Sequence, residues 1–159
     1  MTKRNLETSI DVDAAPEETW TVLSDLKRMP EWSPQCRGMW PLSALRTGTI
    51  TVNVNRRGRK YWPTASKVVR FEPNRAIAFQ TLTNNSIWDF EIAPTATGSR
   101  ITERRLVPTD GTTWISETIV AHVLGGEDSF DDEMLDGMNE TLAKIKAAVE
   151  GVSALRRSG

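Results

Sequence analysis

The sequence is poor in the side chains that most catalytic and metal sites use. Cys36 is its one cysteine and His122 is its one histidine. A single thiol excludes a disulfide within the chain and fits a reducing compartment. A single imidazole excludes a histidine-rich metal site and any mechanism that needs two histidines. Because two soft ligands do not make a metal site, we expect no metal and no other cofactor.

Long apolar runs, a charge excess and the common nucleotide motifs are also missing. No stretch approaches the roughly 18 apolar residues of a membrane span, and the N-terminus has no apolar region typical of a signal peptide. The 20 basic and 21 acidic residues leave a net charge of −1, which argues against nucleic-acid binding. Hydrolase and phosphate-binding glycine motifs are absent. We therefore expect a cytoplasmic protein with neither a nucleic-acid partner nor integral membrane association.

The hydrophobic period changes twice along the chain. Residues 6–12 alternate apolar and polar side chains, which is typical of a half-buried strand. Pro16 and the two glutamates after it then favour the start of a helix, which Met29 and Pro30 would end. Alternating segments with short turns follow and predict an antiparallel meander. Its strands are expected at 49–55, 62–71, 76–82, 88–92 and 101–107.

After residue 108 the pattern becomes helical. Residues 115–123 fit a short helix, and a long amphipathic helix is predicted over about 128–150. Its apolar positions alternate steps of four and three residues and therefore share one face; they are Met138, Leu142, Ile145, Val149 and Val152. Gly151 would cap this helix, and residues 153–159 would fray. The chain length suits a single domain, expected over 1–152, with a flexible tail over 153–159.

Several short motifs occur in a characteristic order over nearly the whole chain. They are Ile10–Trp20, Trp32–Pro34, Asn55–Gly58 before Trp62, Glu72–Pro73 before Ile77 and Phe79, Trp88–Phe90, Gly98–Glu103, and Gly137–Met138 before Thr141–Lys146. In this order the sequence resembles the START-like superfamily, and within it the polyketide cyclase/dehydrase type of small SRPBCC protein.

The resemblance implies an α+β helix-grip fold, in which a curved antiparallel sheet of about seven strands wraps around a long C-terminal helix. Two short helices would follow the first strand, and one short helix would precede the long one. A cavity between sheet and helix is also implied. Members commonly bind lipids, sterols, polyketides or other apolar molecules there, and a minority transform them. The fold alone does not decide between these functions.

Aromatic side chains are the richest feature of the sequence, with six tryptophans. Strand parity places Trp62, Phe79, Trp88 and Phe90 on one face, where they would either pack in the core or line the cavity. Methionines on the long helix suit a variable apolar ligand. The residues that we predict to bind the ligand are Trp32, Trp62, Phe79, Trp88, Phe90, Glu103, Arg105, Met134, Met138 and Leu142.

The last predicted strand directs two charges inward if Ile101 and Val107 also point inward. A charge buried in an apolar cavity must be paired, so a Glu103–Arg105 pair would give the cavity a polar anchor. The alternative is an ion pair at the surface or at the end of the sheet. Glu103 is the one candidate for a general acid or base, and a lone carboxylate does not make an enzyme.

Opposite charges are segregated along the chain. Residues 46–75 hold eight basic and one acidic side chain, whereas residues 127–140 hold seven acidic and no basic ones. Such runs are typical of solvated faces, and they also suit a homodimer. The hairpin at 56–60 would attract anionic partners, which is the basis of a regulatory hypothesis.

Three functions are therefore consistent with the sequence. The favoured one is an intracellular binding protein for a small hydrophobic molecule such as a lipid, an isoprenoid or a polyketide-like compound. The second is a cyclase/dehydratase-type enzyme that uses Glu103 as acid or base. The third is a regulatory protein that acts through the basic hairpin 56–60. Binding is favoured because an enzyme needs several polar groups around one point, and the sequence offers one pair.

Overall fold

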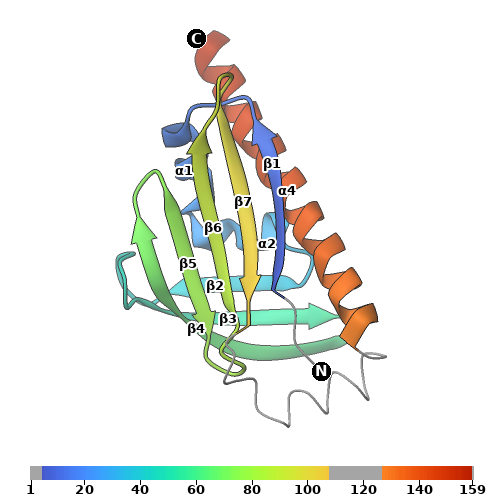
Figure 1. Ribbon diagram of the computed structural model, residues 1–159. Coiled ribbons are helices and arrows are strands. Elements are labelled where there is room, and N and C mark those ends of the chain that lie inside the picture. Colours follow the sequence, from blue (N-terminus) through green and yellow to red (C-terminus); the bar gives the residue numbers. More distant parts are fainter. Residues whose placement is uncertain (1–4, 108–126, 159) are drawn as a thin grey trace.

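The computed structural model describes residues 5–107 and 127–158 (Figure 1). Within these ranges, seven strands form one antiparallel sheet. The strands are β1 (Leu6–Val12), β2 (Cys36–Pro41), β3 (Ile50–Arg57), β4 (Lys60–Glu72), β5 (Ala76–Thr81), β6 (Ile87–Pro94) and β7 (Ser99–Leu106). The described helical segments are α1 (Pro16–Leu23), the 3-10 turn η1 (Leu26–Arg28), α2 (Met29–Trp32) and α4 (Glu127–Ser158).

The sheet follows the order β1-β7-β6-β5-β4-β3-β2. Consecutive hairpins connect β2 to β7, and β1 returns to pair with β7, so that Thr8 lies opposite Glu103. Register shifts lie between Cys36 and Gly38 and between Val68 and Arg70. Because bulges increase bending and twist, the long strand β4 can pair with β3 in its first part and β5 in its second. In Figure 1, β3 accordingly crosses the lower part of the molecule while β5, β6 and β7 stand upright.

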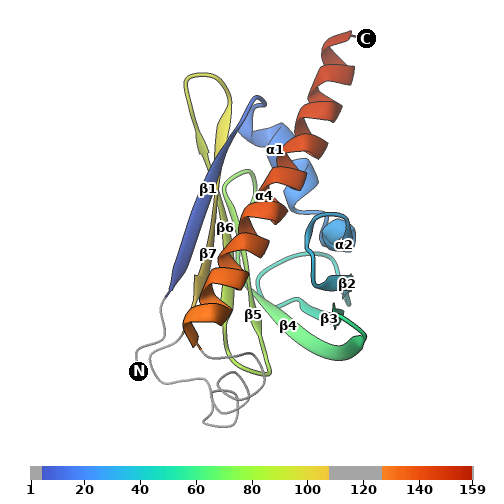
Figure 2. The ribbon, with the colours of Figure 1, turned by 90° about the vertical axis from the view of Figure 1, so that its right-hand side faces the viewer.

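The long helix α4 packs along one face of this curved sheet, beside α1 and α2 (Figure 2). Its buried side chains include Met138, Leu142, Ile145 and Val149, with exposures of 2% or less. Leu142, Ile145 and Val149 belong to a core of strand and helix residues that includes Val12, Leu23, Leu26, Trp32, Val68, Ile77, Phe90, Ile92 and Ile101. Full burial of one such side chain contributes about 1.5–3 kcal/mol to folding. The predicted helix-grip fold is confirmed. The predicted apolar face of the long helix is also confirmed from Met138 to Val149.

The opposite face of β6 and β7 is polar and carries an ion-pair network. Arg70 and Arg104 each place a guanidinium nitrogen 3.1 Å from a carboxylate oxygen of Asp89. Both arginines also pair with Glu91. The two faces of the sheet are therefore chemically distinct, and the face toward α4 is the one that can enclose an apolar molecule.

Three local predictions need correction. β2 was not among the strands predicted individually, because it is short and contains Gly38 and Pro41, which weaken the alternation signal. The predicted helix end at residue 150 is wrong, since α4 passes through Gly151 to Ser158. A glycine inside a helix costs only about 1 kcal/mol, which packing of a neighbouring turn can offset. Pro30 does not end a helix but occupies the first turn of α2.

Some expectations stay predictions. The short helix at 115–123 and His122 lie outside the described residues. The single domain over 1–152 and the flexibility of the last residues are not tested by the fold.

Candidate functional site

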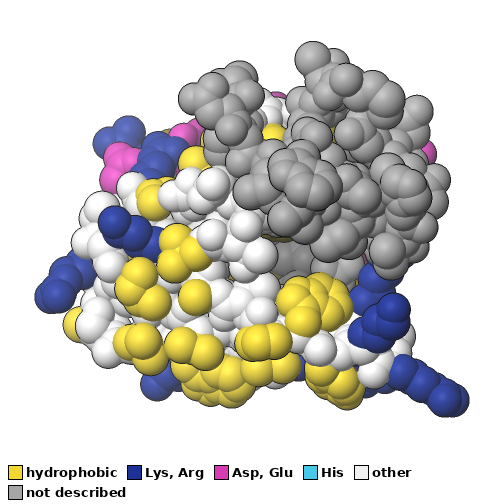
Figure 3. Space-filling view, turned by 90° about the horizontal axis from the view of Figure 1, so that it is seen from below, with side chains coloured by type: hydrophobic (Ala, Val, Ile, Leu, Met, Phe, Trp, Pro, Cys, Tyr) yellow, Lys and Arg dark blue, Asp and Glu magenta, His cyan; other side chains and the backbone are white. Residues whose placement is uncertain are grey.

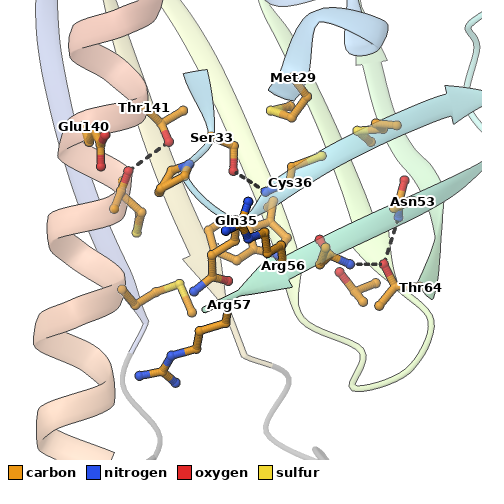
Figure 4. A pocket seen from close by; sticks show the side chains of 18 of the residues that line it. Met29, Ser33, Gln35, Cys36, Asn53, Arg56, Arg57, Thr64, Glu140 and Thr141 are labelled. Atoms are coloured by element: carbon orange, nitrogen blue, oxygen red, sulfur yellow. Dashed lines mark hydrogen bonds between the residues drawn. The ribbon is translucent and has the colours of Figure 1, made fainter. Parts of the chain in front are cut away.

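A cavity of about 480 Å³ lies between the sheet and α4 (Figure 4). This volume falls in the range of small-molecule sites, roughly 300–1,000 Å³. Strands β2 to β7, the segment around α2 and the N-terminal half of α4 all contribute to its wall. Figure 4 shows Glu140 and Thr141 on the helix, with Asn53 and Thr64 on strands away from it. Gly58 and Glu133 line the cavity and are exposed, so it reaches the surface between the β3–β4 hairpin and α4.

One wall of the cavity is aromatic and sulfur-rich. Phe79 lies opposite Trp88 in the β5–β6 register, and Phe90 follows on the same face. The rings of Phe79 and Phe90 stack with centroids 6.2 Å apart and an angle of 30°. Met29, Cys36 and Met39 also line the cavity, and Met134 and Met138 line it from α4. Flat rings and flexible thioethers form a surface that suits apolar molecules of varying shape.

The other wall is a polar row formed by Asn53, Asn55, Thr64 and Ser66 on β3 and β4. The side-chain amide of Asn53 donates to the hydroxyls of Ser66 (2.9 Å) and Thr64 (3.2 Å). Asn55 donates to Thr64 at 2.9 Å, and Thr51 donates to the amide oxygen of Asn53 at 2.9 Å. These bonds hold the row in place, and the hydroxyl groups of Thr64 and Ser66 accept in them, so that their protons can still be donated to a ligand.

Sequence reasoning missed the polar row. Each strand alone shows only an ordinary mixture of Thr, Ser and Asn. The signal lies in the register across the hairpin, which sets Asn53 opposite Thr64 and directs both toward the cavity. Combining the parity of both strands with the Gly58 turn would have found it.

Glu103 projects from β7 into the same cavity and is 2% exposed. Its neighbours in register are Phe90 on β6 and Thr8 on β1. Oε1 of Glu103 is buried and has no hydrogen-bond partner within the described residues. Burial disfavours the charged form and raises the pKa of Glu103 to about 8. At neutral pH the cavity therefore holds a mostly protonated carboxyl group, which is a hydrogen-bond donor.

The expected Glu103–Arg105 pair is absent from the structure, although both side chains are buried as predicted. Arg105 instead places its guanidinium 5.9 Å from the Trp88 ring centroid and donates to the hydroxyl of Ser86 at 3.4 Å. Residues two apart on a strand are separated by about 7 Å, and the Trp88 face offers a closer partner. Arg105 does not line the cavity.

The ten predicted ligand-binding residues divide into two groups. Six line the cavity: Phe79, Trp88, Phe90, Glu103, Met134 and Met138. Four do not. Trp32 and Leu142 are 1% exposed and belong to the core, Trp62 is 38% exposed, and Arg105 packs against Trp88. Trp32 lies at the end of α2, and Leu142 lies one helical turn beyond Met138. Both side chains are apolar like those that line the cavity, but their positions place them in the core. The binding roles themselves stay predictions.

Charged residues border the mouth of the cavity. Arg57 on the hairpin pairs with Glu133 on α4 at 2.6 Å. Arg56 donates to the carbonyl of Gly58 at 2.8 Å, and its guanidinium lies 5.6 Å from the Tyr61 ring centroid. Two of the hairpin cations are thus engaged within the chain, and a regulatory role of the hairpin 56–60 stays a prediction.

Exposed apolar side chains gather on the lower face of the molecule, with Lys and Arg around them (Figure 3). On β2 to β4 they include Trp40, Val52, Tyr61 and Trp62. Val52 lies opposite Trp40 in register, on the face of β3 that points away from the cavity. The homodimer that the segregated charges suit stays a prediction.

Neither a metal centre nor a membrane span is found in the part of the chain that the structure describes. Over residues 5–107 and 127–158, no three acidic, cysteine or histidine side chains are arranged to hold a metal ion. Among those same residues, no helix has the length and apolar character needed to cross a bilayer.

Comparison with known sequences supports the resemblance. Residues 3–150 match the sequence profile of the family described as polyketide cyclase/dehydrase and lipid transport. No curated protein matches the chain.

Solved structures with the same fold include two aromatase/cyclases. The two-domain StfQ from the steffimycin biosynthetic pathway superposes with a TM-score of 0.76 at 16% identity. The match covers 94% of this chain and 51% of StfQ, so the chain spans about half of that protein. The Zhui aromatase/cyclase from a Streptomyces species gives a TM-score of 0.69 at 14% identity, covering 92% and 93% of the two chains.

A third structure is a polyketide-cyclase-like protein from Corynebacterium glutamicum. It superposes with a TM-score of 0.61 at 24% identity, covering 92% of this chain and 91% of that one. At these identities the likenesses concern the fold.

Proposed function

Because the chain belongs to the polyketide cyclase/dehydrase and lipid transport family, we propose that it binds a small hydrophobic molecule between the sheet and α4. The aromatic wall of the cavity carries this proposal. Phe79, Trp88 and Phe90 would contact the ligand on one side and Met134 and Met138 on the other. Lipids, isoprenoids and polyketide-like compounds all have the apolar area that such a wall requires. A cytoplasmic location is part of the proposal.

Native mass spectrometry of the gently purified protein tests the proposal directly. We expect an additional mass that solvent extraction releases as an acyl, isoprenoid or polyketide skeleton. An empty protein that also takes up nothing from a lipid extract would contradict the proposal.

A matched pair of variants locates the ligand. Met134 lines the cavity and is partly exposed, so Met134→Lys places a charge in the wall at little cost to folding. Ala143 is exposed on the same helix and does not line the cavity, so Ala143→Lys is the control. We expect Met134→Lys to lower the affinity for an apolar dye at least tenfold and Ala143→Lys to leave it unchanged. Equal affinities in both variants would remove α4 from the site.

An enzymatic function of the cyclase/dehydratase type is the second candidate. The observation that favours it is the buried carboxyl of Glu103, whose pKa of about 8 suits proton transfer near neutral pH. Two neighbours in fold are aromatase/cyclases. If the chain transforms a polyketide-like substrate, Glu103→Gln should abolish turnover while circular dichroism and dye affinity stay unchanged. A carrier would show no turnover in either form.

A further inference from the structure

We propose that the carboxyl group of Glu103 donates a hydrogen bond to a carbonyl oxygen of the bound molecule, so that the cavity selects flat ring ketones over hydrocarbons of the same shape. This proposal rests on the binding function proposed above and names the class of ligand and the residue that recognises it.

Glu103 holds an unused polar atom inside an otherwise apolar part of the wall. The side chain is 2% exposed, and its buried Oε1 meets no donor or acceptor among the described residues. A buried polar atom without a partner destabilises the protein, and a ligand that supplies a partner removes this loss. Phe90 lies opposite Glu103 in the β6–β7 register, so the carboxyl group borders the aromatic wall.

The protonation state decides which partner fits. A carboxylate accepts hydrogen bonds only, whereas a neutral carboxylic acid also donates one. Burial alone raises the pKa of Glu103 to about 8. The neutral acid that prevails below this pH requires an acceptor, and a ketone oxygen is an acceptor without a donor.

Among the residues that the structure describes, no charged group near the cavity offsets this effect. On the same strand, Arg105 turns toward Trp88 and Ser86. The other charged or titratable groups that line the cavity come from β3, α4 and β2, and none forms an ion pair with Glu103; they are Arg56, Arg57, Glu133, Asp136, Glu140 and Cys36. Burial also raises the pKa of the Cys36 thiol, which stays uncharged at neutral pH.

The shape of the wall favours a flat ligand. The rings of Phe79 and Phe90 are stacked at 30°, and Trp88 lies opposite Phe79 in register. Offset stacking on such rings adds to the gain from burial only when the ligand is itself planar. A planar ring system that bears a carbonyl group at its edge can stack on the aromatic rings and accept a hydrogen bond from Glu103.

The experiment compares 9-fluorenone with fluorene, which share a planar ring frame and differ in the carbonyl group. Affinities are measured by isothermal titration calorimetry at pH 6 and pH 9.5. We expect the wild-type protein to bind 9-fluorenone at least tenfold more tightly at pH 6, and this preference to fall toward one at pH 9.5. A preference that does not change with pH would overturn the proposal.

Two variants distinguish the effect of the hydrogen bond that Glu103 donates from the effect of its side-chain volume. Glu103→Gln keeps a donor that does not titrate, so it should prefer 9-fluorenone at both pH values. Glu103→Met keeps the volume and removes the donor, so it should bind both compounds equally. A retained preference in Glu103→Met would overturn the proposal. If this variant does not fold, the pH profiles of the wild type and of Glu103→Gln still decide the question.

The outcomes distinguish this inference from the function on which it rests. If the wild type binds both compounds equally at pH 6, the ketone preference is wrong and hydrophobic binding stands. If neither compound binds, both proposals fail. A tighter complex with the cationic 9-aminofluorene than with 9-fluorenone would show that Glu103 acts as an anion, and would overturn the proposed donation.

Discussion

Arg57 on the β3–β4 hairpin and Glu133 on α4 form a 2.6 Å ion pair that joins the two elements bordering the mouth of the cavity. The pair is about one-third and one-half exposed on its two sides. Exposed pairs of this kind contribute at most about 1 kcal/mol to stability. Its position, rather than its strength, therefore gives it a consequence for ligand exchange.

We expect Arg57→Ala to speed ligand release without unfolding the protein. Stopped-flow measurement of dye dissociation should show a severalfold higher rate, while the melting temperature changes by only a few degrees. The exchanged pair Arg57→Glu with Glu133→Arg should restore slow release. Arg59→Ala is the control, because Arg59 makes no ion pair within the described residues. An equal acceleration in Arg59→Ala would assign the effect to overall charge.

The buried carboxyl of Glu103 should make stability depend on pH. Because the pKa of Glu103 is raised to about 8 in the folded state from an ordinary value of 4.5, the folded protein keeps a proton that the unfolded chain loses between these values. The stabilisation is complete below about pH 4.5 and is lost as the pH rises through about 8, with a slope of at most about 1.4 kcal/mol per pH unit.

Glu103→Gln should remove this slope. Urea unfolding at pH 5, 6.5 and 8 should show the stability of the variant, relative to wild type, rising with pH. Glu17→Gln, at an exposed position of α1, should follow the wild type at every pH. Parallel curves for the wild type and Glu103→Gln would mean that the carboxyl group is solvated.

Substitutions of Leu142 and Met134 by alanine should distinguish a residue of the core from a residue that lines the cavity. Leu142 is 1% exposed in the core, so Leu142→Ala should destabilise the fold by about 2–5 kcal/mol and leave the dye affinity of the folded fraction near wild type. Met134→Ala should change stability little and weaken dye binding. Denaturant titration and dye titration on the same samples check both effects, and loss of affinity in Leu142→Ala alone would reverse the assignment.

Gly98 should tolerate no side chain. A Cβ atom at Gly98 would lie 2.3 Å from the carbonyl oxygen of Val12 and 2.7 Å from the backbone nitrogen of Ala14. Backbone atoms of a packed strand cannot step aside as a side chain can, so Gly98→Ala should cost about 1–3 kcal/mol. Gly151→Ala is the control, because open space surrounds that position and alanine favours helix. Equal stabilities by urea unfolding would contradict the close contact.

The regular spacing of apolar residues was sufficient to predict the helix and strands that bury one face. The spacing of Met138, Leu142, Ile145 and Val149 identified the face of α4 that meets the sheet, and strand parity brought Phe79, Trp88 and Phe90 to one wall. Both inferences are local, because a side chain's direction follows from its place in a helix or strand.

What escaped prediction depends on how neighbouring strands are paired. The polar row requires the exact pairing of β3 with β4, in which Asn53 meets Thr64. Arg105 packs on Trp88, seventeen positions away, and a neighbouring strand had to place that ring within reach. In both cases the deciding information is a register, which a single strand does not contain.

The pairing of β1 with β7 has a consequence for how the chain is made. The first strand of the chain, Leu6–Val12, finds its hydrogen-bonding partner only when Ser99–Leu106 has been synthesised. Contacts so distant in sequence form slowly, because a long loop must close first. On the ribosome the hairpins from β2 to β7 can form in succession before β1 finds its partner, and α4 emerges after them. The aromatic wall on β5 and β6 would therefore stay uncovered from its own synthesis until α4 has been made.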